Sequence, residues 1–270
     1  MDVLRRNNVT VQGPPDAAAL LFAHGFGCDQ GMWRHVAPAF TSTHQVVLFD
    51  HVGAGGSDLS AWRPERYRRL DGYALDVVEI VEALGLPPVV LVGHSVSAMI
   101  GVLAAADRPE LFDRLVLVTP SPRYIDDDGY RGGFSADEID ELLDTMDGNY
   151  LGWSRHIAPV VMGVPERPDL GQELTASFCR ADPAIARHFA RTTFRSDNRA
   201  DLDRVSTPAL VLQCRDDALA PLEVGEYVHA HLLGSELVVL DAQGHCPNLS
   251  APDQVVAAMR AYLQRAPGGP

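Results

Sequence analysis

The amino-acid sequence predicts an α/β fold, in which helices flank a mostly parallel central sheet and a helical segment is inserted between two of the strands. Short aliphatic runs typical of buried strands alternate with segments whose apolar residues recur at helical spacing. Repeated along the chain, this order requires a parallel sheet with right-handed crossovers. From about residue 123 to 196 no strand-like run appears. We therefore expect residues 1–122 and 197–270 to form the core, and residues 123–196 to form a helical lid within the same domain.

Composition narrows the possible ligands. The chain has 270 residues, and 46% of them are hydrophobic, which suits a globular protein with a substantial core. Its 22 basic and 36 acidic residues give a formal net charge of −14. This charge repels phosphate backbones and anionic lipid, so we expect neither nucleic acid nor a membrane as a partner. The expected ligand is neutral or apolar.

The sequence gives no reason to expect a metal or a cofactor. His24, Cys28, His245 and Cys246 match no common zinc spacing, and adjacent residues rarely point at one ion. The remaining cysteines are scattered, and the first ten residues lack the apolar stretch and cleavage site of a secretory signal. We therefore expect reduced thiols in a cytoplasmic protein. The arginine-rich, lysine-poor composition favours a bacterial source.

The first elements lead to the edge and centre of the sheet. Residues 3–11 are predicted to form a short antiparallel hairpin, and residues 18–23 the first buried strand. Residues 46–49 form the next predicted strand. The glycine-rich loop that follows it, residues 50–58, lacks the spacing of a phosphate-binding loop, so we interpret it as structural. Apolar residues at helical spacing then predict an amphipathic helix over residues 70–84.

Residues 88–106 predict a buried strand that turns sharply into a helix at Ser95. This context is that of a nucleophile elbow, in which a strained turn holds a serine hydroxyl at the top of a sheet. The signature is G-x-S-x-G, and this chain has Ser97 in place of the second glycine. A membrane span is disfavoured, because Gly93 to Ser95 interrupt the apolar run and no basic cluster flanks it. A buried strand-turn-helix without catalysis is the other alternative.

The loop after the first buried strand is a candidate for half of an oxyanion hole. It reads His24-Gly25-Phe26-Gly27, and in hydrolases with a nucleophile elbow such a loop supplies one amide donor. The Phe26 amide would be that donor, and the Val96 amide the second. The alternative is an ordinary turn with a core aromatic residue.

The second half of the chain supplies the other candidate catalytic groups. Residues 115–118, 209–213 and 237–240 are predicted strands, and residues 253–263 a closing helix. Asp216 and Asp217 follow the second of these strands, and His245 follows the last one in a Gly-His turn. Nucleophile, acid, histidine is the chain order of an α/β-hydrolase triad, with either aspartate as the acid. That acid would fix the histidine tautomer and stabilise its cation.

With these motifs located, the chain resembles the small α/β-hydrolases that include the bacterial stress-response regulator RsbQ and the plant strigolactone and karrikin receptors. The resemblance runs nearly end to end. It rests on residues 24–30 (HGFGCDQ), 93–101 (GHSVSAMIG), 121–124 (SPRY), 132–134 (GGF), 149–150 (NY) and 244–247 (GHCP). The serine at position 97 is a feature that the chain shares with the plant receptors. Residues 182–187 (DPAIAR) and 212–214 (LQC) instead resemble segments of the bacterial regulator.

The resemblance implies roles that the residues alone leave open. It selects Asp217 as the acid, because this is the aspartate four residues before Pro221. It also implies a V-shaped lid of four helices over an apolar pocket. The aromatic residues that would line this pocket, unless they form the lid's own core, are Phe26, Phe134, Trp153, Phe189 and Phe194.

These observations favour a serine hydrolase of the RsbQ-like type. Its substrate would be a small, uncharged, hydrophobic ester or lactone, attacked by Ser95 with help from His245 and Asp217. The alternative is a signalling module, in which the same pocket senses a small molecule and the lid surface passes the result to a regulatory protein partner such as a phosphatase. A binding protein with a dead site is the least expected, since every catalytic group is present.

Overall fold

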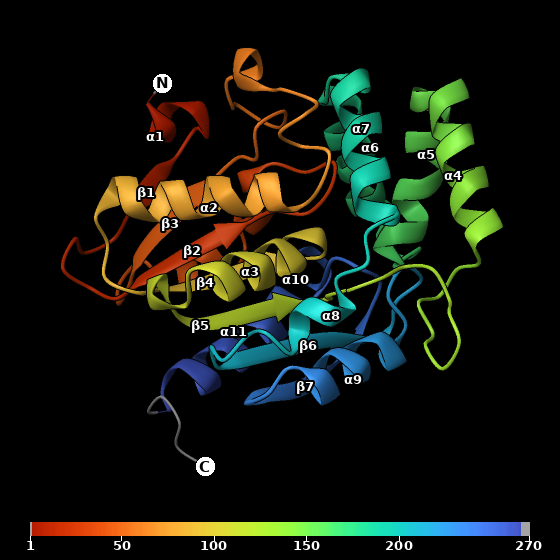
Figure 1. The fold of residues 1–270 in the computed structure, drawn as a ribbon. Coiled ribbons are helices and arrows are strands. Elements are labelled where there is room, and N and C mark those ends of the chain that lie inside the picture. The colour runs from red at the N-terminus through yellow and green to blue at the C-terminus, as the bar shows by residue number, and fades with distance from the viewer. Residues whose placement is uncertain (1, 266–270) are drawn as a thin grey trace.

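The computed structural model describes residues 2–265 and confirms the predicted sheet (Figure 1). Seven strands are arranged in the order β1-β3-β2-β4-β5-β6-β7. All neighbours pair in parallel except β1, which is antiparallel to β3. The strands are β1 (Thr10–Gln12), β2 (Ala19–Ala23), β3 (Gln45–Phe49), β4 (Val89–His94), β5 (Phe112–Val118), β6 (Ala209–Asp216) and β7 (Ser235–Gln243).

The central strands are aliphatic because both of their faces are covered. Every residue of β2 and β4 is buried. Alternate side chains point to opposite faces, so Leu21 and Leu91 pack with the helices α2 (Asp71–Leu84) and α3 (Val96–Asp107). Phe22 and Val92 face the other side, toward α11 (Pro252–Leu263) and the helices between β5 and β6. Figure 1 shows α2 and α3 in front of the sheet and α11 behind it.

The remaining elements connect the strands. The helices outside the insertion are α1 (Val3–Arg6), α2 (Asp71–Leu84), α3 (Val96–Asp107), α8 (Arg199–Leu202), α9 (Leu222–His231), α10 (Pro247–Ser250) and α11 (Pro252–Leu263). Short 3₁₀ turns are η1 (Gln30–Trp33), η2 (Ala37–Ala39), η3 (Leu59–Ala61) and η4 (Pro109–Leu111). Within residues 2–265, none of the helices has the length and apolarity that crossing a membrane requires.

Four helices lie between β5 and β6, where the sequence contains no strand-like run. They are α4 (Ala136–Gly148), α5 (Tyr150–Met162), α6 (Pro168–Arg180) and α7 (Pro183–Phe194). Each start carries a local signal: Ser135 and Glu138 form a capping box for α4, and Asn149 caps α5. Proline is the first residue of α6 and of α7. Because parallel strands point the same way, a segment inserted after β5 lies over the carboxyl edge of the sheet, as Figure 1 shows.

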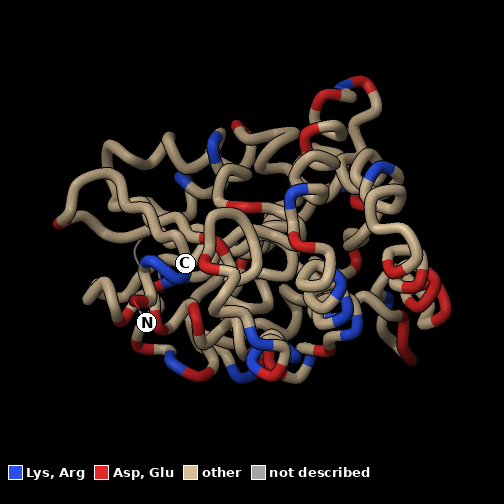
Figure 2. Tube along the Cα trace, turned by 90° about the horizontal axis from the view of Figure 1, so that it is seen from above, with Lys and Arg blue, Asp and Glu red and all other residues tan. Residues whose placement is uncertain are grey.

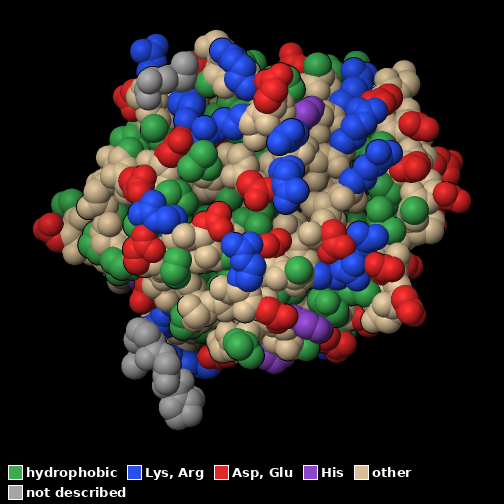
Figure 3. Space-filling model, in the orientation of Figure 1, with side chains coloured by type: hydrophobic (Ala, Val, Ile, Leu, Met, Phe, Trp, Pro, Cys, Tyr) green, Lys and Arg blue, Asp and Glu red, His purple; other side chains and the backbone are tan. Residues whose placement is uncertain are grey.

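Ion pairs join the outer faces of the inserted helices α4 and α7. Figure 2 shows acidic residues gathered along α4, and α7 carries arginines. Arg195 lies 2.8 Å from Asp140, and Arg191 pairs with Asp147. Exposed pairs contribute at most about 1 kcal/mol each, so the apolar side chains beneath them stabilise the insertion. Charges of both signs also cover the face shown in Figure 3.

The predicted hairpin over residues 3–11 is wrong, because this segment begins with the helix α1. The Asp2 carboxylate caps that helix. Arg6 then turns inward, and its guanidinium lies 3.0 Å from Asp76 and 2.7 Å from Glu79 on α2. A strand through these residues would separate the charges, so the helix forms and only Thr10–Gln12 join the sheet.

Candidate active site

Ser95 lies in a strained turn between β4 and α3. Its backbone has φ 56° and ψ −122°, a conformation rare for residues other than glycine. The turn is tight, since a Cβ atom at Gly93 would come within 2.4 Å of the Ser97 carbonyl oxygen. The Ser95 amide donates to the Val118 carbonyl at 2.8 Å, which fixes the turn to β5. The hydroxyl is thereby held at the carboxyl edge of the sheet.

Ser97, which replaces the second glycine of the elbow signature, is bound to the neighbouring strand end. Its hydroxyl donates to the His24 carbonyl oxygen at 2.5 Å and lies 2.7 Å from His51 Nε2. The side chain is fully buried. A small hydroxyl is therefore accommodated where glycine is usual, because it satisfies a carbonyl group at the end of β2. This contact ties the elbow helix to the loop that carries Phe26.

His245 bridges Ser95 and Asp217. His245 Nε2 lies 2.7 Å from Ser95 Oγ, and His245 Nδ1 lies 2.7 Å from Asp217 Oδ2. All three residues are buried. An ionised carboxylate only accepts hydrogen bonds, so Nδ1 carries the proton and Nε2 presents a lone pair to the serine hydroxyl. In this tautomer the imidazole can accept the Ser95 proton.

The backbone around His245 is fixed from several sides. The His245 carbonyl accepts hydrogen bonds from His94 Nε2 at 2.7 Å and from Thr119 Oγ1 at 3.0 Å. Burial lowers the pKa of His94 to about 3, so its ring is neutral and donates from Nε2. Gly244 precedes the histidine with φ 82°, and a Cβ atom there would collide with the Met162 carbonyl oxygen. Only glycine fits this turn against the end of α5.

Asp217, rather than its neighbour Asp216, faces the histidine. Asp217 Oδ1 accepts the amides of Leu219 and Ala220 at 2.8 and 3.1 Å, which leaves Oδ2 for His245. Asp216 is exposed and ends β6. The pairing of β6 with β7 is irregular between Cys214 and Asp216.

The two candidate oxyanion donors lie beside Ser95. Phe26 is in the loop after β2, and Val96 is the first residue of α3. The loop is close to Ser95, since a Cβ atom at Gly25 would lie 3.5 Å from Ser95 Cβ. Among residues 2–265, no protein group accepts a hydrogen bond from the Phe26 or Val96 amide. Both donors are therefore free for a ligand.

A narrow cavity of about 30 Å³ lies over Ser95 and His245. Phe26, Trp153 and Phe194 line it, as the resemblance implies. The lining also includes side chains that sequence reasoning missed: Cys28, His94, Tyr124, Leu142, Ile157, Val161, Leu174, Phe178, Thr193, Leu219 and Cys246. Nearly all of these groups are apolar, so the cavity suits an uncharged ligand.

The other two predicted pocket residues, Phe134 and Phe189, do not line this cavity. Phe189 points away from Ser95, because its ring stacks on Tyr73 at a centroid distance of 4.4 Å. Phe134 is half-buried in the connection before α4, where its amide donates to the Tyr124 carbonyl at 3.1 Å. The Phe189 ring thus packs on Tyr73, and the Phe134 side chain packs at the edge of the hydrophobic core.

Tyr124 is a missed residue whose side chain approaches the Ser95 hydroxyl. Its hydroxyl oxygen lies 3.4 Å from Ser95 Oγ. Burial raises the pKa of Tyr124 to about 12, so the hydroxyl stays protonated. A tyrosine that follows a central strand at the carboxyl edge of the sheet was the available signal, and it lies within the SPRY segment on which the resemblance rests.

The two cysteines that line the cavity show no nucleophilic environment. All four cysteines are free thiols, and Cys28 and Cys246 line the cavity. Burial raises the pKa of Cys28 to about 12 and also raises that of Cys246, so both remain protonated. Within the described part of the chain, no group of three or more His, Cys, Asp or Glu residues could hold a metal ion.

Comparisons with known proteins find relatives that match nearly the whole chain. Residues 20–258 match the alpha/beta hydrolase family. Strigolactone esterase D14 of Arabidopsis thaliana is 40% identical over 265 residues, which cover 98% of either sequence. Karrikin insensitive 2 receptor CA of Petunia hybrida is also 40% identical, over 95% of each sequence. The solved structure of a hydrolase from Oleispira antarctica superposes with a TM-score of 0.95 at 40% identity, and covers 98% of this chain and 97% of that one.

Proposed function

Since the chain belongs to the alpha/beta hydrolase family, we propose that it is a serine hydrolase of small, neutral, hydrophobic esters or lactones, with Ser95, His245 and Asp217 as its triad. The observation that carries this proposal is the continuous contact from Ser95 Oγ through the His245 ring to Asp217. The relative named as an esterase supports ester hydrolysis, and the relative named as a receptor supports the binding of a small ligand.

The first half of the proposed reaction forms an acyl-enzyme. Ser95 Oγ attacks the carbonyl carbon while its proton passes to His245 Nε2, and Asp217 stabilises the resulting imidazolium. The carbonyl oxygen becomes an oxyanion, which the free amides of Phe26 and Val96 would receive. The tetrahedral intermediate then collapses. The carbon–oxygen bond to the alcohol breaks, and His245 returns the proton to the leaving oxygen.

The second half releases the acid. Water attacks the acyl carbon and gives a proton to His245 Nε2, and the same amides stabilise the oxyanion. The bond to Ser95 Oγ breaks, and the serine recovers its proton from the imidazolium. For a lactone, the alcohol and the acid remain parts of one ring-opened product. The triad is unchanged after each turnover.

The lining of the cavity sets the proposed substrate class. Apolar contact contributes roughly 25 cal/mol per Å² of buried surface. A carboxylate that enters without a partner costs several kcal/mol, and the cavity lining contains no lysine or arginine. Neutral esters and butenolide-like lactones should therefore react better than anionic ones.

Hydrolysis of p-nitrophenyl acetate and butyrate tests the proposal. The purified protein should release p-nitrophenol, and Ser95→Ala should reduce release to the uncatalysed rate. Ser97→Ala is the matched control, because it removes a neighbouring hydroxyl that does not touch His245. Wild-type turnover in Ser95→Ala would place the nucleophile elsewhere.

A second candidate function is small-molecule sensing of the RsbQ-like type, with little turnover and a regulatory protein partner. The relative named as a receptor, together with helices that nearly close the cavity, favours it. A sensor should release p-nitrophenol in one burst equal to the enzyme concentration, followed by slow turnover. A gene for a PAS-containing phosphatase next to this one would favour the sensor, whereas rapid multiple turnover would favour the hydrolase.

A further inference from the structure

An open groove of about 630 Å³ lies next to the narrow cavity over Ser95. The loops after β2 and β3 form one side of the groove, and helices α6 and α7 form the other. Its volume is in the range of pockets that hold small molecules, whereas the 30 Å³ over Ser95 is far below that range. An ester therefore needs more room than the cavity alone provides.

A thin wall separates the groove from the cavity. Phe26 and Cys28 are the two residues that line both spaces. On the cavity side, the Phe26 ring lies 6.1 Å from the ring of Phe194; on the groove side, it lies 5.7 Å from the ring of Phe189. Phe26 is only partly buried, although aromatic rings surround it. The Phe26 side chain is therefore the one aromatic group that lies between the two spaces.

The backbone at Phe26 is anchored independently of its ring. Gly27, which follows it, accepts a hydrogen bond at its carbonyl oxygen from Ser177 Oγ of α6 at 2.8 Å. Gly25, which precedes it, packs against His94, because a Cβ atom there would lie 2.4 Å from the His94 ring. The ring can therefore turn while the Phe26 amide stays beside Ser95.

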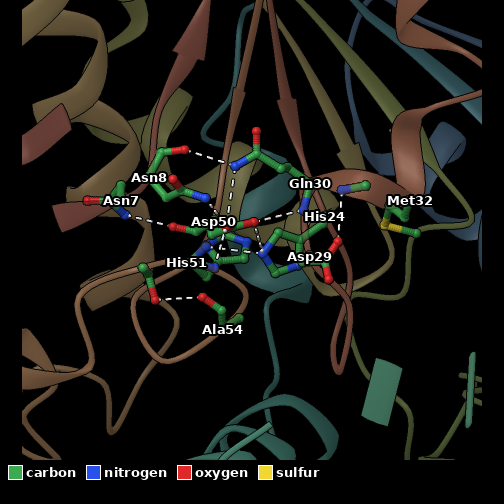
Figure 4. Close-up of polar contacts among 12 residues, drawn as sticks. Asn7, Asn8, His24, Asp29, Gln30, Met32, Asp50, His51 and Ala54 are labelled. Atoms are coloured by element: carbon green, nitrogen blue, oxygen red, sulfur yellow. Dashed lines mark hydrogen bonds and ion pairs between the residues drawn. The ribbon is translucent and has the colours of Figure 1, made fainter. Parts of the chain in front are cut away.

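The polar and charged groups along the groove disfavour an anionic occupant. Figure 4 shows Asp50 at the centre of a polar cluster. Its carboxylate accepts Asn8 Nδ2 at 2.7 Å, the Gln30 amide at 2.8 Å and the Gly56 amide at 2.8 Å. At the rim, Arg180 lies 3.0 Å from Asp29. The lining of the groove therefore offers no unpaired positive charge to an anion.

The glycine-rich loop after β3 does not offer an anion site either. The Gly53 amide donates to Ser57 Oγ at 3.0 Å, and the Ala54 amide donates to the His51 carbonyl at 2.9 Å. With the Gly56 amide bound to Asp50, these donors are occupied, and the Asp50 carboxylate repels phosphate. On the other wall, α6 contributes the polar Ser177 and Arg180, whereas the residues in and before α7 are apolar: Ala181, Ile185, Ala186 and Phe189.

We propose that this groove is a second substrate subsite, which receives the larger apolar substituent of a neutral ester or lactone when the Phe26 ring turns away from the cavity. The inference rests on the proposed function, because it assigns the reacting carbonyl to Ser95. The occupied groove adds apolar contact with α7, so it selects bulky neutral substrates over small ones.

Filling the groove tests the proposal. Ala181→Trp places a large ring in it, and Ala181→Phe is the milder alternative if the tryptophan variant does not fold. Val160→Trp on α5 is the matched control, because Val160 is exposed and lines neither space. The readout is the ratio of kcat/KM for a large to a small ester, in one series that lengthens the acyl group and one that enlarges the alcohol.

In at least one series, Ala181→Trp should lower this ratio by about tenfold or more, and Val160→Trp should keep it. Phe26→Ala, which retains the backbone amide, should raise the ratio in the same series. Ratios within twofold of wild type for folded Ala181→Trp in both series would overturn the proposal. So would a loss of large-ester activity in Ile157→Trp alone, because it would place the substrate between α4 and α5.

The serine hydrolase function and the groove subsite can be tested separately. If the wild-type protein is not labelled at Ser95 by a fluorophosphonate, the proposed function fails. If Ser95 is labelled and the ratios do not move, only the groove subsite fails.

Discussion

Replacing Asp217 by asparagine changes one atom and reverses the hydrogen bonding of His245. In the wild type, Asp217 Oδ1 accepts the Leu219 and Ala220 amides, and Oδ2 accepts the proton of His245 Nδ1. The asparagine oxygen would keep the two amide donors. Its NH₂ group would then face Nδ1 and force the imidazole into the tautomer that carries its proton on Nε2. That nitrogen could no longer accept the proton of Ser95.

The size of this effect follows from the loss of the base. Holding the wrong tautomer costs about 10⁴-fold in turnover in triads of this kind. At about 1.36 kcal/mol for each factor of ten, this corresponds to roughly 5.4 kcal/mol of transition-state stabilisation. Asp216→Asn is the matched control, because Asp216 is exposed and does not contact His245. We expect that control to stay within a few-fold of wild type.

The assay is kcat/KM for p-nitrophenyl butyrate at pH 7, with circular dichroism to confirm that both variants are folded. The expected order is wild type close to Asp216→Asn, and both far above Asp217→Asn. The reasoning is refuted if Asp216→Asn is the slower variant, or if folded Asp217→Asn retains more than a tenth of wild-type activity.

Two further predictions concern the cavity and the core. Trp153→Ala should enlarge the cavity and shift the preference among p-nitrophenyl esters toward longer acyl chains. Phe134→Ala is the control, because Phe134 does not line the cavity, and it should keep the wild-type chain-length profile. The same profile in both variants would show that Trp153 does not limit the size of the pocket. Burial lowers the pKa values of His24, His51 and His94, so the unfolded chain binds protons that the folded chain does not. The free energy of unfolding should therefore be at its maximum above about pH 6.5. Below that pH it should decrease, by up to about 1.36 kcal/mol per pH unit for each histidine. Urea unfolding at pH 7 and pH 5 measures this, and equal stabilities would contradict it.

Local patterns were sufficient for the sheet and the elbow. The strand and helix around Ser95 are specified by consecutive residues, and an aliphatic run followed by Gly93 leaves few other conformations. The Gly-His turn before His245 is similarly local, because Gly244 must adopt a positive φ against α5. Such features depend on covalent geometry and burial, and both can be predicted from the residue types and their spacing in the sequence.

The sequence alone did not predict which of two neighbouring residues faces the site, or which face of a helix lines the cavity. Asp216 and Asp217 differ only in the direction of their side chains, which depends on where β6 ends; only the resemblance favoured Asp217. Phe189 lies on an amphipathic helix, and its direction depends on the position of Tyr73, which is distant in sequence. Tyr124 was missed for the same reason, since its approach to Ser95 depends on the path of the chain after β5.

The segment before the sheet shows how the ion pairs of one arginine can override a strand pattern. Arg6 pairs with Asp76, a residue 70 positions away that is buried in α2. The spacing of residues in the sequence does not predict that contact. The apolar residues at positions 3, 4 and 9 are compatible with either a hairpin or a short helix, and the pairing of the arginine selects the helix.

The central claim is that Ser95 is the nucleophile, and the mass of a covalent adduct tests it most directly. After incubation with a fluorophosphonate, intact-protein mass spectrometry should show one added group on the wild type, and peptide analysis should locate it on Ser95. Ser95→Ala should remain unmodified, and Ser97→Ala should be modified as the wild type is. An adduct on any other residue, or an unmodified wild-type protein that still hydrolyses esters, would contradict the proposed mechanism.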